Sequence, residues 1–322
     1  MIVTAQDRKR NCGDEMETRG PILHGPKRQH FLPRSYLNGF TKSGKLAVYD
    51  RETDDDRIQT PTNTAVIHDF YTMKDDKDRK RYEIETMLSD YESKGIEAIR
   101  KLMEWELLTS DQRRDLSILL ALFVGRVPSF VDSIKEMYSD LGKTMARAMF
   151  NDSAVAKEIL EQIDDKQRTS DDYHREAEGI VRFIRADNYT INVNHMKAMH
   201  LAITSTLELA HIFANRNWSL FHLGNSRDSL ITTDAPVVIT TTRPRPPSMF
   251  GIGFAASDAV TIVPIAGSCL LVMSGGEGQL EHGLIDPRKI LEVNQLLASR
   301  CKRLVIGRDR KLIKFLSERI SR

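Results

Sequence analysis

A histidine near the start of the chain stands in a stretch that mixes polar side chains with aromatic and apolar ones. The stretch runs from Lys27 to Phe40 and reads KRQHFLPRSYLNGF, with the histidine at position 30. Because an imidazole titrates near neutral pH, His30 could act as a general base or as a metal ligand. It could equally be a core histidine whose ring N–H donates to a carbonyl oxygen, and its surroundings alone favour that structural interpretation.

Two glutamates on a predicted helix could act as a pair. Glu85 and Glu92 are seven residues apart, which is nearly two helical turns, so both carboxylates face the same way about 10 Å apart along the helix axis. They could share a divalent cation with His30, or serve as acid and base. The alternative is that both flank the apolar stripe of the helix with their carboxylates in water, and the spacing alone favours it.

Arg126 lies on the apolar face of the next predicted helix, three residues after Phe123 and seven after Leu119. A guanidinium does not lose its proton in a protein, so a buried Arg126 needs an anionic partner. Glu85 or Glu92 could provide it, and so could an anionic oxygen of a substrate. If the helix ended before Arg126, the side chain would instead be exposed.

A further acidic residue, Asp234, lies in the run TTDAP between two predicted strands. Its side chain could cap a turn, or it could present a carboxylate at the end of a sheet, where catalytic groups often lie. The sequence contains no P-loop, no GxSxG nucleophile elbow and no complete dinucleotide-binding glycine motif. The enzyme classes that depend on those motifs are therefore not indicated.

The elements that must position these residues follow from hydrophobic periodicity and from turn residues. Apolar residues at helical spacing predict helices over 82–105, from Ser110-Asp111 as the cap to a break at Pro128, and over 130–149, 154–166, 171–186, 193–215, 290–302 and 311–319. Alternating and β-branched runs predict strands over 45–50, 218–223, 230–233, 237–241, 260–265, 268–273 and 304–306.

This order of elements predicts an α+β fold. We expect a mixed or antiparallel sheet built from N-terminal and C-terminal strands, with a long helical insertion at about residues 82–216 and a β-rich part at about 217–310. Residues 1–26 are expected to form a flexible leader, and residues 27–322 a single α+β domain.

Composition indicates the cellular compartment in which the protein is expected. The chain has 322 residues, with 47 Lys and Arg against 45 Asp and Glu, and only three widely spaced cysteines. The cysteines argue against a disulfide framework and for a reducing compartment. The first twenty residues contain no apolar signal segment, and the apolar stretch 118–124 is far shorter than the roughly 20 residues of a membrane span. We therefore expect a cytoplasmic protein with no membrane partner.

Positive charge is concentrated at the two ends of the chain. Residues 1–51 hold ten basic and five acidic side chains, and residues 302–322 hold eight basic and two acidic ones. Such ends could bind phosphate-rich partners such as a nucleic acid or a nucleotide. The interpretation that we favour from charge alone is a solvated tail and a solvated last helix, because charge runs usually serve solubility.

Several of these residues stand in runs that resemble a known family. The runs are HFLPRSYLNGF from His30, KLAVYDR from Lys45 and DFY from Asp69. Over about residues 27–310 the chain resembles a widespread, mainly bacterial family catalogued as a domain of unknown function, number four-two-three-eight. Later segments resemble the pattern of the same family: a glutamate pair seven apart, an Arg-x-Pro helix end and a Ser-Asp-Asn-Pro strand turn. The turn reads Thr-Asp-Ala-Pro here, with Ala235 in place of the usual Asn.

The family name carries no reaction, but the resemblance implies that six polar positions belong to one recurring pattern. They are His30, Tyr36, Glu85, Glu92, Arg126 and Asp234. Polar positions spread along a chain form a meaningful group if the fold gathers them into one pocket.

One hypothesis is a metal-dependent phosphodiester hydrolase, such as a nuclease-like effector or toxin. Glu85, Glu92 and Asp234 would hold Mg²⁺ or Mn²⁺. The candidate catalytic residues are His30 as general base, Arg126 as the group that stabilises charge on the phosphate, and Tyr36. The basic ends would guide a nucleic acid.

The alternative is a binding or sensor protein without catalysis. Its polar residues would form a buried structural network in which Arg126 pairs with both glutamates and His30 donates to Asp234. The helical insertion would then carry a partner or a homodimer interface. A common solvent-reachable cleft would favour the enzyme, and a sealed, mutually paired network would favour the alternative.

Overall fold

The computed structural model describes residues 22–163, 169–224, 228–244 and 251–320. Most of the expected flexible leader, residues 1–21, lies outside this range. The chain divides into two compact units, one comprising the chain up to Pro128 together with Ile203 onward, and the other Ser129–Ala202. Every predicted site residue belongs to the first unit.

The helices follow the periodicity of the sequence closely. They are α2 (Arg34–Asn38), α3 (Glu83–Met103), α4 (Ser110–Gly125), α5 (Pro128–Met149), α6 (Ser153–Ile163), α7 (Ser170–Ala186), α8 (His195–Asn215), α9 (Pro287–Ser299) and α10 (Arg310–Ile320), with a 3-10 turn at Pro61–Asn63. The expected break at Pro128 is confirmed, because α4 ends at Gly125 and Pro128 opens α5.

The strands include all of those predicted and several that were not. They are β1 (Arg28–His30), β2 (Leu46–Asp50), β3 (Asp55–Gln59), β4 (Val66–His68), β5 (Met73–Lys74), β6 (Lys80–Arg81), β7 (Asn217–His222), β8 (Thr232–Thr233), β9 (Val238–Thr241), β10 (Ala259–Ala266), β11 (Cys269–Ser274), β12 (Leu280–Leu284) and β13 (Leu304–Gly307). The α+β class is confirmed.

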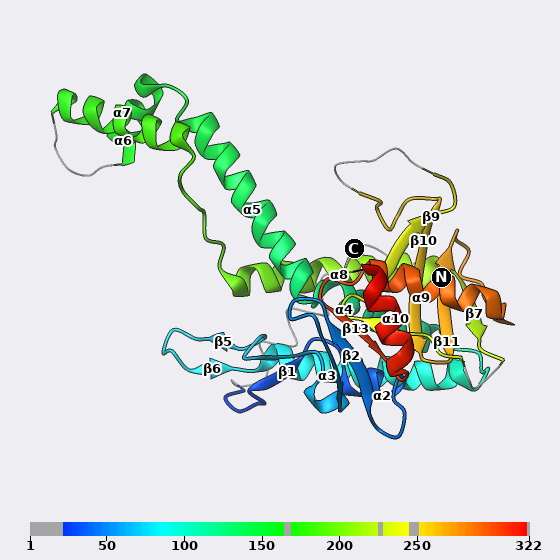
Figure 1. Ribbon diagram of the computed structural model, residues 1–322. Helices are drawn as coiled ribbons and strands as arrows, with labels where there is room; N and C mark the ends of the chain where they lie inside the picture. Colours follow the sequence, from blue (N-terminus) through cyan, green and yellow to red (C-terminus); the bar gives the residue numbers. More distant parts are fainter. Residues whose placement is uncertain (1–21, 164–168, 225–227, 245–250, 321–322) are drawn as a thin grey trace. The chain divides into compact units, whose positions relative to one another are not determined.

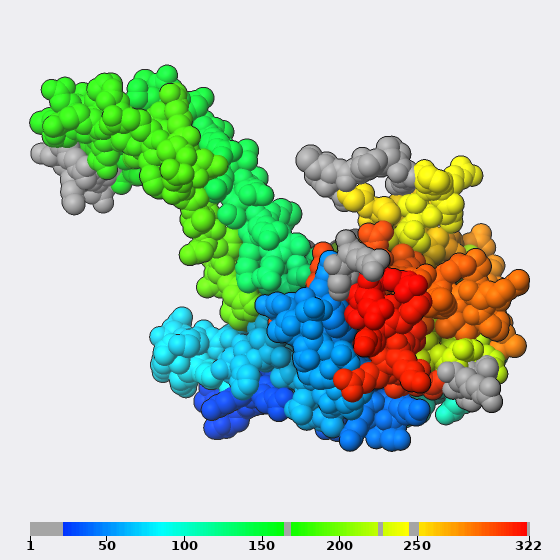
Figure 2. Space-filling view, in the orientation of Figure 1, coloured from blue at the N-terminus to red at the C-terminus, as the bar shows by residue number. Residues whose placement is uncertain are grey.

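One sheet joins the two ends of the chain. Within the described residues its four strands run in the order β3-β2-β13-β8, all antiparallel. β2 is buried along its whole length and pairs with β13, with Val48 opposite Ile306. Helices α9 and α10 contribute Leu297 and Leu316 to the core beside this sheet. α10 packs against β2, and in the space-filling view the blue part of the chain, which includes β2, lies beside the red part, which includes α10 (Figure 2). The expected sheet of N-terminal and C-terminal strands is therefore present.

A second sheet holds most of the remaining β-rich part (Figure 1). Within the described residues its strands run in the order β12-β7-β11-β10-β9, and the sheet is mixed because β12 lies parallel to β7. β7 alternates buried and half-buried positions, as expected of a strand with one face on the core. The edge strand β12 was not predicted, because its sequence LEHGL combines two polar residues with a glycine.

Helices α3 and α4 form a helical hairpin. It carries three of the predicted site residues, Glu85, Glu92 and Arg126. Gly95 lies where the helices touch: a Cβ atom added there would lie 2.6 Å from the Cβ atom of Leu119. α4 begins with a capping box in which Thr109, not the predicted Ser110-Asp111, accepts from Gln112. The small residue and the cap fix the spacing and the start of the second helix.

The other unit, Ser129–Ala202, is helical. α6 and α7 pack on each other through Ala156, Ala177 and Val181. Within the described residues, no single helix is long and apolar enough to cross a membrane, although α4 and α5 taken together would pass on length and composition as a bent, broken pair.

Replacement of Gly95 by alanine should destabilise the protein. The new methyl group meets the Leu119 Cβ atom, whose position is fixed by the α4 backbone, and overpacking of this kind costs about 1–3 kcal/mol. Gly179→Ala in α7 is the matched control, because nothing lies within 4 Å of its added methyl group. It should gain about 0.5–1 kcal/mol from helix propensity. Thermal unfolding of both variants tests this, and equal shifts would contradict close α3–α4 packing at Gly95.

Candidate functional site

The α3–α4 hairpin and the segment before it bring five polar side chains together. Glu85 and Glu92 come from α3, Arg126 caps the end of α4, and His30 ends β1. Tyr71, which follows β4, joins them. The charges of Arg126 and Glu92 act on the other three side chains, so the five lie within electrostatic reach of one another. These five residues are called the Arg126 group below.

Arg126 is the centre of this group. Its side chain is fully buried, and its Nη1 donates to Glu92 Oε1 at 2.5 Å. Its backbone N–H donates to Leu122, which keeps Arg126 on the end of α4 rather than in solvent. The guanidinium also lies 5.9 Å from the centre of the Phe123 ring. Of the two partners expected from the sequence, Glu92 is the one that forms the ion pair.

Two nitrogens of the same guanidinium have no partner. Within the described residues, Arg126 Nε and Nη2 are buried and donate to no acceptor, and the buried Tyr71 hydroxyl has no hydrogen-bond partner either. Buried donors of this kind are rare, because each forfeits the hydrogen bond that it would make with water.

Glu85 is the acid of the group. Burial, followed by the negative charge of Glu92, raises the pKa of Glu85 to about 7, and the Arg126 charge offsets only part of this rise. A carboxyl with a pKa near 7 is protonated in about half of the molecules at neutral pH. It can therefore both give and take a proton under ordinary conditions.

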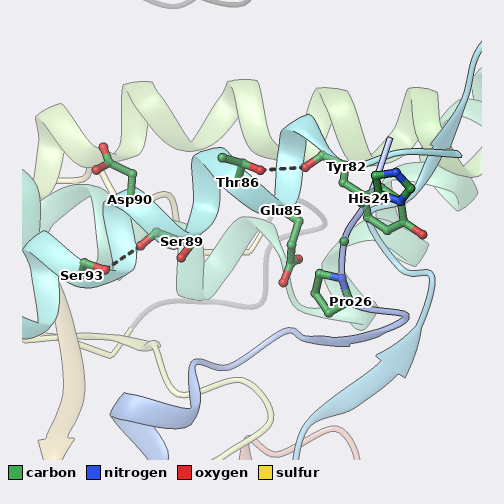
Figure 3. Close-up of a pocket in the computed structure, with 9 residues that line it drawn as sticks. His24, Pro26, Tyr82, Glu85, Thr86, Ser89, Asp90 and Ser93 are labelled. Carbon is green, nitrogen blue, oxygen red and sulfur yellow. Dashed lines mark hydrogen bonds between the residues drawn. The ribbon is translucent and has the colours of Figure 1, made fainter. Parts of the chain in front are cut away.

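Glu85 also reaches a pocket. The pocket has a volume of about 530 Å³ and is lined by the 24–26 segment and by one side of α3, including Thr86, Ser89 and Ser93. Figure 3 shows the Glu85 carboxyl directed toward Pro26, whereas Asp90 points to the other side of the helix. The Thr86 and Ser93 hydroxyls donate to backbone carbonyls of their own helix, at 3.2 and 2.9 Å. A molecule in this pocket would therefore meet Glu85, together with His24 and Asp90, which also line it.

Tyr71 was not predicted as a site residue, although the motif DFY that ends in it contributed to the family resemblance. Its side chain is fully buried, and burial raises the pKa of the hydroxyl, so it keeps its proton. The buried Gln29 fixes the backbone here, because its Oε1 accepts from the Tyr71 N–H at 2.6 Å and its Nε2 donates to Thr72. In the sequence, the only pointers to Tyr71 were its place in the DFY run and the polar residue Gln29 beside His30.

His30 is neutral in this setting. Burial lowers the pKa of the imidazole, with Arg28 and Arg126 acting in the same direction. Its Nε2 lies 3.3 Å from the carbonyl oxygen of Pro61, to which a neutral ring can donate. The bond to Asp234 that the network hypothesis expected is not the one formed. His30 instead ties β1 to the Pro61 turn.

The structure places Asp234 outside the Arg126 group. Its carboxylate accepts from the backbone N–H groups of Lys302 and Arg303, at 3.0 and 2.8 Å, and its own N–H donates to Leu304. Both oxygens thus hold the turn that leads into β13. Among the described residues no three His, Cys, Asp or Glu side chains are arranged to hold a metal ion. The expected set of Glu85, Glu92 and Asp234 is therefore not assembled.

Tyr36 is also outside the group. Its hydroxyl donates to the carbonyl oxygen of Pro264 at 2.7 Å and lies 2.8 Å from the Thr232 hydroxyl. The side chain is buried, with its ring 4.6 Å from that of Phe123. Tyr36 therefore joins α2 to both sheets, and both hydrogen-bonding capacities of its hydroxyl are in use.

Comparison with known proteins supplies a family but no reaction. The family described as "Protein of unknown function (DUF4238)" matches residues 28–311. No curated protein matches the chain, and neither does any solved structure.

Replacement of Glu92 by glutamine should weaken the fold. The change leaves the buried Arg126 charge without its counter-ion, and the loss of one partner of a buried pair costs about 3–5 kcal/mol. Because Glu92 is 24% exposed, we expect the lower end of this range. Asp90→Asn is the control on the same helix, since it breaks an exposed pair with Lys94 that is worth about 0.5 kcal/mol. Equal losses in urea unfolding would show that Arg126 does not depend on Glu92.

Replacement of Glu85 by glutamine should stabilise the protein, and more so at higher pH. The folded-state pKa of about 7 exceeds the ordinary value of 4.5, so the folded state binds the proton more tightly. Wild-type stability therefore falls as the pH rises from about 4.5 to 7, a loss that glutamine does not share. Melting temperatures of the two proteins should coincide near pH 4.5 and diverge up to about pH 8. A glutamine variant that melts lower at pH 8 would contradict the assignment.

Proposed function

The chain belongs to the DUF4238 family, whose description names no reaction, and we propose that this protein is a hydrolase of phosphodiester bonds that works at the Glu85 pocket. The observation that carries the proposal is the state of Glu85: a carboxyl with a pKa of about 7 at the wall of an open pocket. Perturbed carboxyls in clefts are typical of acid–base catalysts.

A comparison within the chain supports this interpretation. Asp50 is an almost fully buried carboxyl with a structural role. Its burial alone would raise its pKa, but hydrogen bonds from Arg303 and Arg57 outweigh that effect and hold the pKa below the ordinary value. Glu85 receives only partial compensation from the Arg126 charge, and its pKa stays raised. Its environment favours proton transfer rather than a permanent charge.

The other members of the group would serve a reaction at phosphorus. Hydrolysis of a phosphodiester needs a base that takes a proton from water and positive charge near the phosphoryl oxygens. Glu85 would accept the proton from the attacking water and return it to the leaving alkoxide. Arg126 would supply the positive charge, and its ion pair with Glu92 would fix the orientation of the guanidinium. Neutral His30 would hold the strand that borders the group.

The donor set does not favour a divalent cation at this site. Mg²⁺ and Mn²⁺ prefer charged oxygen ligands. Of the two glutamates on α3, Glu92 is engaged with Arg126 and Glu85 is half protonated at neutral pH. A cation would have to displace both the guanidinium and the proton. The proposed chemistry is therefore acid–base, and its metal dependence is one arm of the assay below.

Charge at the C-terminal end gives only limited support for nucleic acid over nucleotide as substrate. Arg303 forms ion pairs with Asp50 and Glu52, and Arg310 with Asp56. These pairs neutralise part of the positive charge that the sequence places after residue 301. The proposal therefore names the phosphodiester bond and leaves the length of the substrate to experiment.

The complete burial of Arg126 favours a second candidate, a binding or sensor protein without catalysis. In that case the Arg126–Glu92 pair would serve to fix α3 against α4, and a ligand in the pocket would be bound without being changed. The Glu85→Gln variant distinguishes the two candidates, because the second one predicts no turnover for it to abolish.

The assay uses bis(4-nitrophenyl) phosphate, a dinucleotide, and single-stranded RNA and DNA, each with EDTA and with Mg²⁺ or Mn²⁺. Wild-type protein should cleave at least one of them in EDTA, with a kcat that rises with pH as Glu85 loses its proton. Glu85→Gln should lower kcat/KM by about 100-fold or more. Glu97→Gln, an exposed position on the same helix, should change it less than twofold. Absence of cleavage in every condition would reject the hydrolase.

A further inference from the structure

Three buried donors of the Arg126 group point to an acceptor that the chain does not supply. They are Arg126 Nε, Arg126 Nη2 and the Tyr71 hydroxyl, all without a hydrogen-bond partner within the described residues. Both side chains are fully buried. An arginine cannot relieve this by losing its proton, and the Tyr71 backbone is held by Gln29.

The arrangement of the free nitrogens is informative. Nη1 is occupied by Glu92, which leaves Nε and Nη2 free. These two N–H groups lie on one edge of the planar guanidinium and run parallel, the geometry that binds two oxygens of a phosphate or a carboxylate at once. The edge best suited to an oxyanion is therefore the edge that the protein leaves open.

We propose that Arg126 and Tyr71 form an oxyanion subsite that holds the phosphodiester as a single negative charge, with Glu85 at its entrance. The inference rests on the proposed function and names the charge class of the substrate. Of the Arg126 group, only Glu85 lines the pocket, and Arg126 and Tyr71 are fully buried. A ligand that enters from the pocket would therefore meet Glu85 first.

The charges around the subsite select a monoanion. Arg126 contributes one positive charge, which Glu92 already balances, and His30 is neutral. A phosphate monoester or inorganic phosphate carries close to two negative charges at neutral pH. Its second negative charge would meet no further positive charge in the Arg126 group, and ionised Glu85 would repel it. A phosphodiester carries one charge, and it binds best when Glu85 is protonated and can itself donate.

Proton linkage follows from this arrangement. Burial and the Glu92 charge already raise the pKa of Glu85 to about 7. An anion bound nearby favours its protonated form further, so binding takes up a proton. Affinity for a monoanion should therefore fall as the pH rises through 7, even though the ligand itself does not titrate there.

The test is thermal stabilisation by dimethyl phosphate, a monoanion that lacks a good leaving group, at constant ionic strength set with chloride. Wild-type protein should be stabilised, with an affinity several-fold tighter at pH 6 than at pH 8. Inorganic phosphate at pH 8 should bind at least about tenfold more weakly than dimethyl phosphate at the same pH.

Tyr71→Phe provides the sharpest variant. It removes a buried hydroxyl that has no partner, so the variant without ligand should be as stable as wild type or more stable, while its affinity for dimethyl phosphate falls about tenfold. Tyr49→Phe is the matched control: it removes a hydroxyl that donates to Asp54 at 2.9 Å. It should lower stability and leave the affinity unchanged. Arg126→Lys should lose affinity because an ammonium lacks the parallel donor edge.

Two outcomes would overturn the inference: no stabilisation of wild type by dimethyl phosphate, or an unchanged affinity in Tyr71→Phe. Tighter binding of inorganic phosphate than of dimethyl phosphate at pH 8 would overturn the monoanion assignment. Failure of the hydrolase proposal is distinguishable, because binding with the predicted pattern can be observed without any cleavage. Conversely, cleavage that persists unchanged in Tyr71→Phe would leave the hydrolase standing and reject this subsite.

Discussion

The burial of a permanent positive charge between two helices is the constraint on which this site depends. Arg126 is sealed from solvent, and a guanidinium cannot escape its charge by titrating. The carboxylate of Glu92, two turns along α3 from Glu85, lies beside it as the counter-ion. That pairing fixes α3 against α4 and gives Glu85 a negative neighbour. One ion pair thus holds α3 against α4 and, after burial, contributes to the raised pKa of the residue that faces the pocket.

Burial alone does not determine what a carboxyl does in this protein. Asp50 is held in its charged form by two arginines. Burial raises the pKa of Asp234, although backbone N–H groups of the turn into β13 counter part of the rise, and it raises the pKa of Glu85 to about 7. Burial pushes the pKa of all three upward, and their partners decide the result. The carboxyl with the fewest partners is the one beside a pocket, which is why the function is assigned there and not to Asp234.

Most of the fold was predictable because the sequence of each element alone shows the pattern typical of a helix or a strand. The helices have strong periodicity, and the buried strands β2, β7, β10 and β11 have alternating or β-branched runs. The break at Pro128 follows from the proline ring, which cannot continue a helix. The longest of the strands that were missed, β3 and β12, read DDRIQ and LEHGL. Neither has the composition of a strand, and each is held by pairing with a better strand whose position no local pattern reveals.

The sequence by itself determined which residue types were available: an imidazole, a guanidinium on an apolar helix face, and two carboxylates on one face of a helix. It could not determine which of them meet, because residues far apart in the chain are brought together by packing that depends on the whole fold. Tertiary structure therefore decided that Glu92 and not Glu85 pairs with Arg126, that Tyr71 joins the group, and that Asp234 and Tyr36 do not. It did so because most polar atoms inside a protein are paired, and the partners available to each are set by geometry in space rather than by spacing along the chain.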